Sequence, residues 1–152
     1  MKVLAVKPEL CNGCGECEKI CATTFYKVPD QARSSIRVAE VSGGKYKVEF
    51  CDQCGECIAA CPPEALYRAK NGIVRLRDKD CVGCLACVGF CPTLVMYTVP
   101  QDIVPFKCIA CGKCVDVCPT KALYMIEADV PLPVTELTRS VRLTTGEGSH
   151  GH

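Results

Sequence analysis

Cysteine is the residue type in this chain whose number and spacing point to chemistry. Sixteen of the 152 residues are cysteine, and the thiolate form of this side chain is a soft metal ligand. Four copies of the spacing CxxCxxCxxxC contain all of them: Cys11, Cys14, Cys17 and Cys21; Cys51, Cys54, Cys57 and Cys61; Cys81, Cys84, Cys87 and Cys91; and Cys108, Cys111, Cys114 and Cys118. Three closely spaced cysteines followed by a fourth are typical of the ligands of 4Fe-4S clusters.

The similarity between the four motifs continues beyond the cysteines. Pro62, Pro92 and Pro119 follow the fourth cysteine in three motifs, whereas Ala22 follows it in the first. The segments CPPEALY, CPTLVMY and CPTKALY align with one another, which indicates an internal duplication. With four thiolates to each cluster, sixteen cysteines supply four 4Fe-4S clusters without remainder. Every iron then has a thiolate ligand, so we expect the clusters to carry electrons and not to bind a substrate.

Zinc and disulfides explain the cysteines less well. Structural zinc sites commonly use cysteine pairs separated by a dozen or more residues, and disulfide frameworks are typical of small secreted chains. Neither explains one spacing repeated four times. The two histidines, His150 and His152, lie in the terminal segment GSHGH, and we expect no metal role for them. No catalytic residue is predicted.

The net charge of the chain depends on the state of its cysteines. It is +1 when they are counted as thiols, and sixteen thiolates with four oxidised cluster cores of about +2 each change it to about −7. Nucleic-acid binding is therefore not expected. A basic group after the second motif is expected to offset cluster charge or to edge a strand, with a docking patch as the alternative. It consists of Arg68, Lys70, Arg75, Arg77 and Lys79.

The segments around the motifs must position the ligands. Residues 31–50 alternate apolar and polar side chains on both sides of a Gly-Gly pair, which predicts an inserted β-hairpin. A short strand is predicted at 73–76. A short helical turn is expected to carry each fourth cysteine toward a different cluster from the preceding three. Together these elements predict an α+β fold that is held by its clusters and is largely unfolded without them.

The apolar runs, the first residues and the last residues of the chain predict its location and a possible contact with a partner. No apolar run approaches the roughly 18 to 20 residues of a membrane-spanning helix, and MKVLAVKPEL has no signal-peptide core. We predict a cytoplasmic protein, with export on a signal-bearing partner as the alternative. Residues 127–152 contain no cysteine and are predicted to form an extended arm on a partner subunit or a mobile tail.

Four such motifs, with the predicted hairpin after the first, resemble the four-cluster ferredoxin-like electron-transfer subunits of multisubunit oxidoreductases over about residues 1–126. The resemblance implies two nested modules of the bacterial two-cluster ferredoxin type. The outer module is 1–30 with 100–126, the insert is 31–50 and the inner module is 51–99. The implied ligand sets are Cys11, Cys14, Cys17 and Cys118; Cys108, Cys111, Cys114 and Cys21; Cys51, Cys54, Cys57 and Cys91; and Cys81, Cys84, Cys87 and Cys61. Sequential pairing of motif one with two and three with four is the alternative.

The same resemblance implies a non-catalytic subunit of anaerobic metabolism. It would serve as a wire between a catalytic subunit with a tungsten or molybdenum cofactor and an acceptor subunit, such as a flavin-containing one. In its strict spacing and small size the chain resembles the small subunit of tungsten aldehyde oxidoreductases. Formate dehydrogenase, hydrogenase, carbon monoxide dehydrogenase and acyl-CoA reductase complexes are alternatives, as are a free polyferredoxin, a redox sensor and a cluster-donating scaffold. Self-association would extend the wire.

Overall fold

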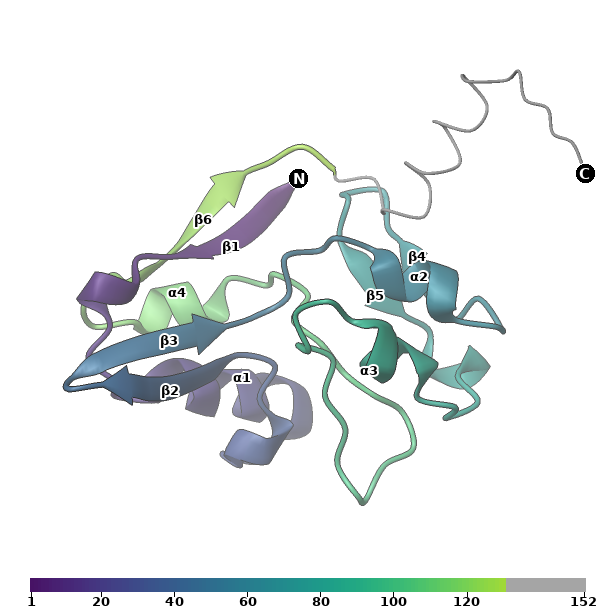
Figure 1. The fold of residues 1–152 in the computed structure, drawn as a ribbon, viewed down its shortest axis with the longest axis horizontal. Coiled ribbons are helices and arrows are strands. Elements are labelled where there is room, and N and C mark those ends of the chain that lie inside the picture. The colour runs from purple at the N-terminus through teal and green to yellow at the C-terminus, as the bar shows by residue number, and fades with distance from the viewer. Residues whose placement is uncertain (131–152) are drawn as a thin grey trace, which may run out of the picture.

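The computed structural model describes residues 1–130, so the predicted arm or tail from 131 onward lies outside the described residues. The strands are β1 (Lys2–Val6), β2 (Arg37–Ser42), β3 (Lys45–Glu49), β4 (Leu66–Arg68), β5 (Val74–Leu76) and β6 (Leu123–Glu127). The helices are α1 (Glu16–Tyr26), α2 (Glu56–Ala60), α3 (Ala86–Phe90) and α4 (Lys113–Val117), with short 3-10 turns at Pro8–Leu10, Gln31–Arg33 and Asp78–Asp80. These elements form two groups that lie side by side (Figure 1).

The first group joins the beginning and the end of the described chain. β1 pairs antiparallel with β6, with Leu4 opposite Met125, and α1 packs against α4. β2 and β3 pair antiparallel within the stretch 31–50. Their turn, Gly43 and Gly44, has positive φ at both residues, which a two-residue turn of this type requires. The buried core of the group is Leu4, Cys17, Ile36, Cys114 and Leu123.

The second group is formed by the middle of the chain. β4 pairs antiparallel with β5, with Tyr67 opposite Arg75, and α2 packs against α3. β5 occupies 74–76 of the strand predicted at 73–76. The buried core is Cys57, Leu66, Val74, Cys87 and Met96. Both cores contain cysteines, so the apolar side chains of each group pack around sulfur atoms.

Helices and two-stranded sheets thus make a small mixed fold, in agreement with the predicted α+β class. Within residues 1–130, none of the helices has the length and apolar character needed to cross a lipid bilayer.

The length of each helix depends on the residue that follows the fourth cysteine. α2, α3 and α4 have five residues each and end directly before that cysteine. The proline after it disfavours helical backbone at the cysteine and cannot donate a helical hydrogen bond. Ala22 carries neither restriction, so α1 continues through Cys21 to a length of eleven residues. Lys27 then caps the helix in the left-handed conformation, with φ of 62°.

We expect Ala22→Pro to break α1 and to destabilise the loaded protein by about 3 kcal/mol or more, because proline removes a helical hydrogen bond and clashes with the preceding turn. Ala22→Gly keeps the N–H group at this fully buried position and should cost about 1 kcal/mol. The measurement is the urea concentration at which cluster absorbance is lost under anaerobic conditions. Equal midpoints for the two variants would contradict the role assigned to the missing proline.

Candidate iron–sulfur sites

The three-cysteine loop of each motif bends through two residues with left-handed backbone. One lies directly before the second cysteine and the other directly after it. The first position holds Gly13, Gln53, Gly83 and Ala110 in the four motifs, and the second holds Gly15, Gly55, Leu85 and Gly112. Their φ angles lie between 53° and 86°. Turns of this kind aim successive N–H groups into one concavity, which favours anionic groups such as a cluster with thiolate ligands.

The fourth cysteine begins a tight turn that returns an N–H group to its own sulfur. In the second motif, Glu64 N donates to Cys61 O at 3.1 Å, and Glu64 has φ of 56°. The following N–H group, of Ala65, then donates to Cys61 Sγ at 3.2 Å. The third motif repeats this turn, with 3.4 Å from Val95 N to Cys91 Sγ. Proline directly after the cysteine suits such a turn because its φ is already fixed.

In the fourth motif the same turn places several donors on Cys118. Burial by itself raises the pKa of this thiol. The hydrogen bonds from the N–H of Leu123, the hydroxyl of Thr120 and the N–H of Ala122 outweigh burial, and the net pKa is lowered from its ordinary value. Hydrogen bonds to ligand sulfurs stabilise the thiolate and raise the reduction potential of the bound cluster.

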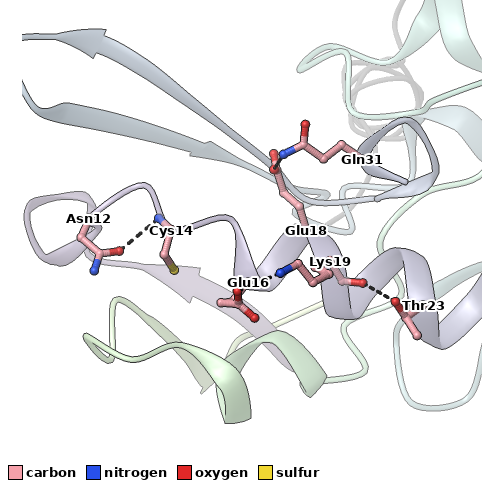
Figure 2. A network of polar contacts seen from close by, with 7 residues as sticks. All are labelled: Asn12, Cys14, Glu16, Glu18, Lys19, Thr23 and Gln31. Carbon is pink, nitrogen blue, oxygen red and sulfur yellow. Dashed lines mark hydrogen bonds and ion pairs between the residues drawn. The ribbon is translucent and has the colours of Figure 1, made fainter. Parts of the chain in front are cut away.

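Cys21 lies within α1 and is served by a distant donor instead. Ser35 N donates to Cys21 Sγ at 3.3 Å. The segment that carries Ser35 is held by Glu18, whose side chain extends from α1 and is buried. Its carboxylate accepts from Val38 N and from Gln31 Nε2, both at 2.7 Å, and Figure 2 shows the contact with Gln31. A long-range contact thus replaces the local turn of the other motifs.

The cysteines of the second and third motifs surround two cavities. One is lined by Cys51, Cys54, Cys57 and Cys91, and the other by Cys81, Cys84, Cys87 and Cys61. In each cavity three cysteines of one motif meet the fourth cysteine of the other. Within residues 1–130 no group of three His, Cys, Asp or Glu side chains is arranged to hold a single metal ion. The two sets of four cysteines instead line a cavity each.

The cysteines of the first and fourth motifs lie together in the first group. Its buried core includes Cys17 and Cys114, and the side chains of Cys21, Cys108 and Cys118 pack against that core. Cys11, Cys14 and Cys111 are near enough for their charges to act on these buried sulfurs. The pKa of Cys17 is raised by burial, then by Glu18, and further by Cys14 and Cys11. The pKa of Cys114 is raised by burial, then by Cys108 and Cys111. The structure therefore brings motif one together with motif four.

The third cysteine is buried in every motif, with at most 8% of its surface exposed. Burial raises the pKa of Cys17, Cys57 and Cys114 to about 12 and also raises that of Cys87. Such a sulfur ionises only beside a positive group that compensates the lost hydration. An iron–sulfur core supplies this charge, so the donor set fits clusters of this kind.

A buried polar contact connects the second motif to the fourth. Gln53, which is fully buried, donates from Nε2 to Cys108 O at 2.9 Å. Lys107 donates to Gln53 Oε1 at 2.9 Å and to the same carbonyl at 2.7 Å. The cysteine pattern alone predicts neither residue. The available signals are glutamine where other motifs have glycine or alanine, and lysine directly before a first cysteine.

Arg68 holds the loop of the second motif in place. It belongs to the basic group that the sequence predicts to offset cluster charge. Its guanidinium donates to the carbonyl oxygens of Gln53, Cys54 and Gly72 at 3.0, 3.1 and 2.8 Å. Because these acceptors lie in the loop and in the β4–β5 turn, Arg68 ties the ligand loop to the sheet.

Two family models match the chain, and both are described as a 4Fe-4S dicluster domain. One covers residues 4–62 and 73–119, and the other covers residues 50–95. Together with the sixteen cysteines, these matches account for four 4Fe-4S clusters, which confirms the predicted cofactors.

Curated relatives share parts of this sequence. An uncharacterized ferredoxin-like protein, YdhX of Escherichia coli (strain K12), is 32% identical over 105 residues, or 64% of this chain and 47% of its own. Thiosulfate reductase electron transfer subunit PhsB of Salmonella typhi is 44% identical over 50 residues, covering 33% and 26% of the two chains. A tetrathionate reductase subunit of Archaeoglobus fulgidus is 30% identical over 97 residues, covering 59% and 45%. The chain thus spans about half the length of the first relative.

We expect Glu18→Ala to destabilise the loaded protein by about 1.5 to 3 kcal/mol, because it removes an ionised acceptor of two hydrogen bonds and leaves their donors unpaired. Loss of this anchor should also release Ser35 from Cys21. The measurement is the urea midpoint of anaerobic cluster loss.

Glu16→Ala is the matched control for this prediction. Glu16 lies two residues earlier on the same helix and pairs with Lys19 at 3.1 Å, with both side chains about half exposed (Figure 2). An exposed pair of this kind is worth about 0.5 kcal/mol or less. Similar midpoints for the two variants would show that Glu18 does not anchor the segment.

Proposed function

We propose that this chain, which belongs to the 4Fe-4S dicluster domain family, is an electron-transfer subunit of a multisubunit oxidoreductase. The observation that carries the proposal is the complete ligand set: four thiolates for each of four clusters leave no iron open to a substrate. When bound, the clusters take up and release single electrons. The chain supplies the thiolates, the N–H donors that stabilise them and a packed surrounding. Catalysis is therefore assigned to a partner.

We infer that the clusters are ligated in the nested order. The pairing of β1 with β6 and the packing of α1 on α4 support an outer module of 1–30 with 100–126, to which the segment 31–50 is added. The packing of α2 on α3 and the two cysteine-lined cavities support an inner module of 51–99. Each fourth cysteine then binds a cluster held mainly by the partner motif of its own module.

The nested order also implies a path through the molecule. Burial is the main cause of the raised pKa of Cys108, and the charge of the nearby Cys51 adds to it. Gln53 spans from one motif to the other. The Cys108 and Cys51 ligand sets therefore meet at the joint between the modules. The sets that begin with Cys11 and Cys81 form the two ends. Four clusters in this order make a wire between two partners.

The names of the relatives bear on the class of the catalytic partner. PhsB and the relative from Archaeoglobus fulgidus are named for reductases of thiosulfate and tetrathionate, which are both sulfur compounds. A partner that reduces an oxidised sulfur compound is accordingly the candidate that these names favour. The tungsten aldehyde oxidoreductase stays a prediction, because these relatives do not bear on it.

Paired cysteine substitutions test the ligation. In the nested order, Cys21 and Cys108 serve the same cluster, so Cys21→Ala with Cys108→Ala should damage one cluster and leave three intact. Cys21→Ala with Cys51→Ala should damage two. Iron content and the electron paramagnetic resonance signals of the reduced protein give the count. The sequential order predicts the reverse result for the two double variants.

The subunit role is tested by anaerobic purification from the native host at natural abundance, with particle mass and elemental content measured together. We expect about sixteen irons per chain, from four clusters of four, in a particle much larger than 16.4 kDa. Tungsten or molybdenum in that particle would identify the class of partner. A particle near the monomer mass, with iron as its only metal, would overturn the subunit role in favour of a free polyferredoxin.

A further inference from the structure

A buried lysine lies at the joint between the two modules. Lys107 has 8% of its surface exposed, although lysine side chains are almost never buried without a partner. Its ammonium donates to Gln53 Oε1 and Cys108 O, which are neutral acceptors. Among the ion pairs found within residues 1–130, none includes Lys107. A buried charge without an opposite charge is costly, so the protein must offset this ammonium in another way.

The sulfur ligands supply the opposite charge. Lys107 lines the cavity that Cys51, Cys54, Cys57 and Cys91 surround. The same ammonium lies 2.7 Å from the carbonyl oxygen of Cys108, a member of another ligand set. One ammonium therefore lies beside two different ligand sets.

We propose that the Lys107 ammonium favours reduction of the two clusters that meet at this joint. They are the cluster held by Cys51, Cys54, Cys57 and Cys91 and the cluster held by Cys108, Cys111, Cys114 and Cys21. This inference rests on the proposed function and on the nested ligation. Each transfer takes one electron from a reduced neighbour, which is oxidised, and adds one negative charge to a cluster near Lys107.

A second consequence concerns the repulsion between the two clusters. Adjacent reduced clusters repel each other, and this repulsion is large where water is excluded. A positive charge between them lowers the energy of every reduced state of the pair. The two inner clusters can then hold electrons, which pass through the two outer clusters to the partners.

Lys107→Met isolates the charge from the hydrogen-bond network. Gln53 Oε1 still accepts from Val74 N at 3.1 Å, and Cys108 O still accepts from Gln53 Nε2 at 2.9 Å. No buried acceptor is left unpaired, and methionine fills a similar volume with an apolar chain. Lys107→Gln is a second neutral variant of different shape, and Lys107→Arg retains the charge.

Lys113→Met is the matched control. Lys113 lies between Cys111 and Cys114 of the same motif, at the first position of α4, but its side chain is exposed. Removal of this charge tests whether any cation near the ligands has the same effect, since water screens an exposed charge far more than a buried one.

The experiment is an anaerobic redox titration of the fully loaded protein, followed by electron paramagnetic resonance, on the wild type and these four variants. We expect Lys107→Met and Lys107→Gln to move two of the four reduction steps to more negative potentials. The other two steps should stay in place, Lys107→Arg should restore both, and Lys113→Met should have a smaller effect.

Unchanged steps in the neutral variants, or equal shifts in Lys113→Met, would overturn the inference and leave the four-cluster carrier intact. Loss of clusters from both neutral variants would also overturn it, because Lys107 would then be needed for assembly. Failure of the proposed function looks different: the wild type itself would bind fewer than four clusters.

Discussion

Under the proposed nested ligation each fourth cysteine has to face away from the three before it, and the backbone around it serves this requirement. In three motifs proline ends the helix, and the turn that follows returns an N–H group to the sulfur, as Ala65 does for Cys61. The first motif has Ala22 and a continuous helix, so no neighbouring N–H group can turn back. The long segment after α1 supplies the missing donor, because it brings the N–H group of Ser35 to Cys21 Sγ.

The same sulfur atoms explain how so small a fold holds together. Helices of five residues and two-stranded sheets are marginal by themselves in water. Each buried core has five residues, of which two are cysteines. The apolar side chains alone therefore enclose little volume, and under the proposed nested ligation the bonds between iron and thiolate would join segments that are far apart in sequence. We therefore expect folding and cluster binding to be one process, as in other small metal-dependent domains.

The sequence allows prediction of the features that follow from local chemistry. Cysteine spacing predicts four clusters, and the pair Gly43 and Gly44 predicts the turn between β2 and β3. Contacts between distant segments leave no such pattern. Glu18 reads as an ordinary charge on a helix, but it is buried because it accepts an N–H group from Val38. Gln53 and Lys107 are likewise separated by about half of the motif-bearing chain and meet only once it is folded.

Duplicated motifs tend to give their clusters similar reduction potentials, and the proposed role of Lys107 is to make them differ. The loops and turns of the motifs give their sulfurs similar N–H donors, which shift the potentials of all clusters in the same direction. Clusters of equal reduction potential would be occupied equally by an electron. The position before the first cysteine is leucine, phenylalanine or aspartate in the other three motifs, so a buried ammonium there occurs once. Lys107 lies at the joint between the modules and not at an end of the wire. Its charge would therefore raise the reduction potentials of the two inner clusters above those of the two outer ones, so that an electron is most stable at the centre.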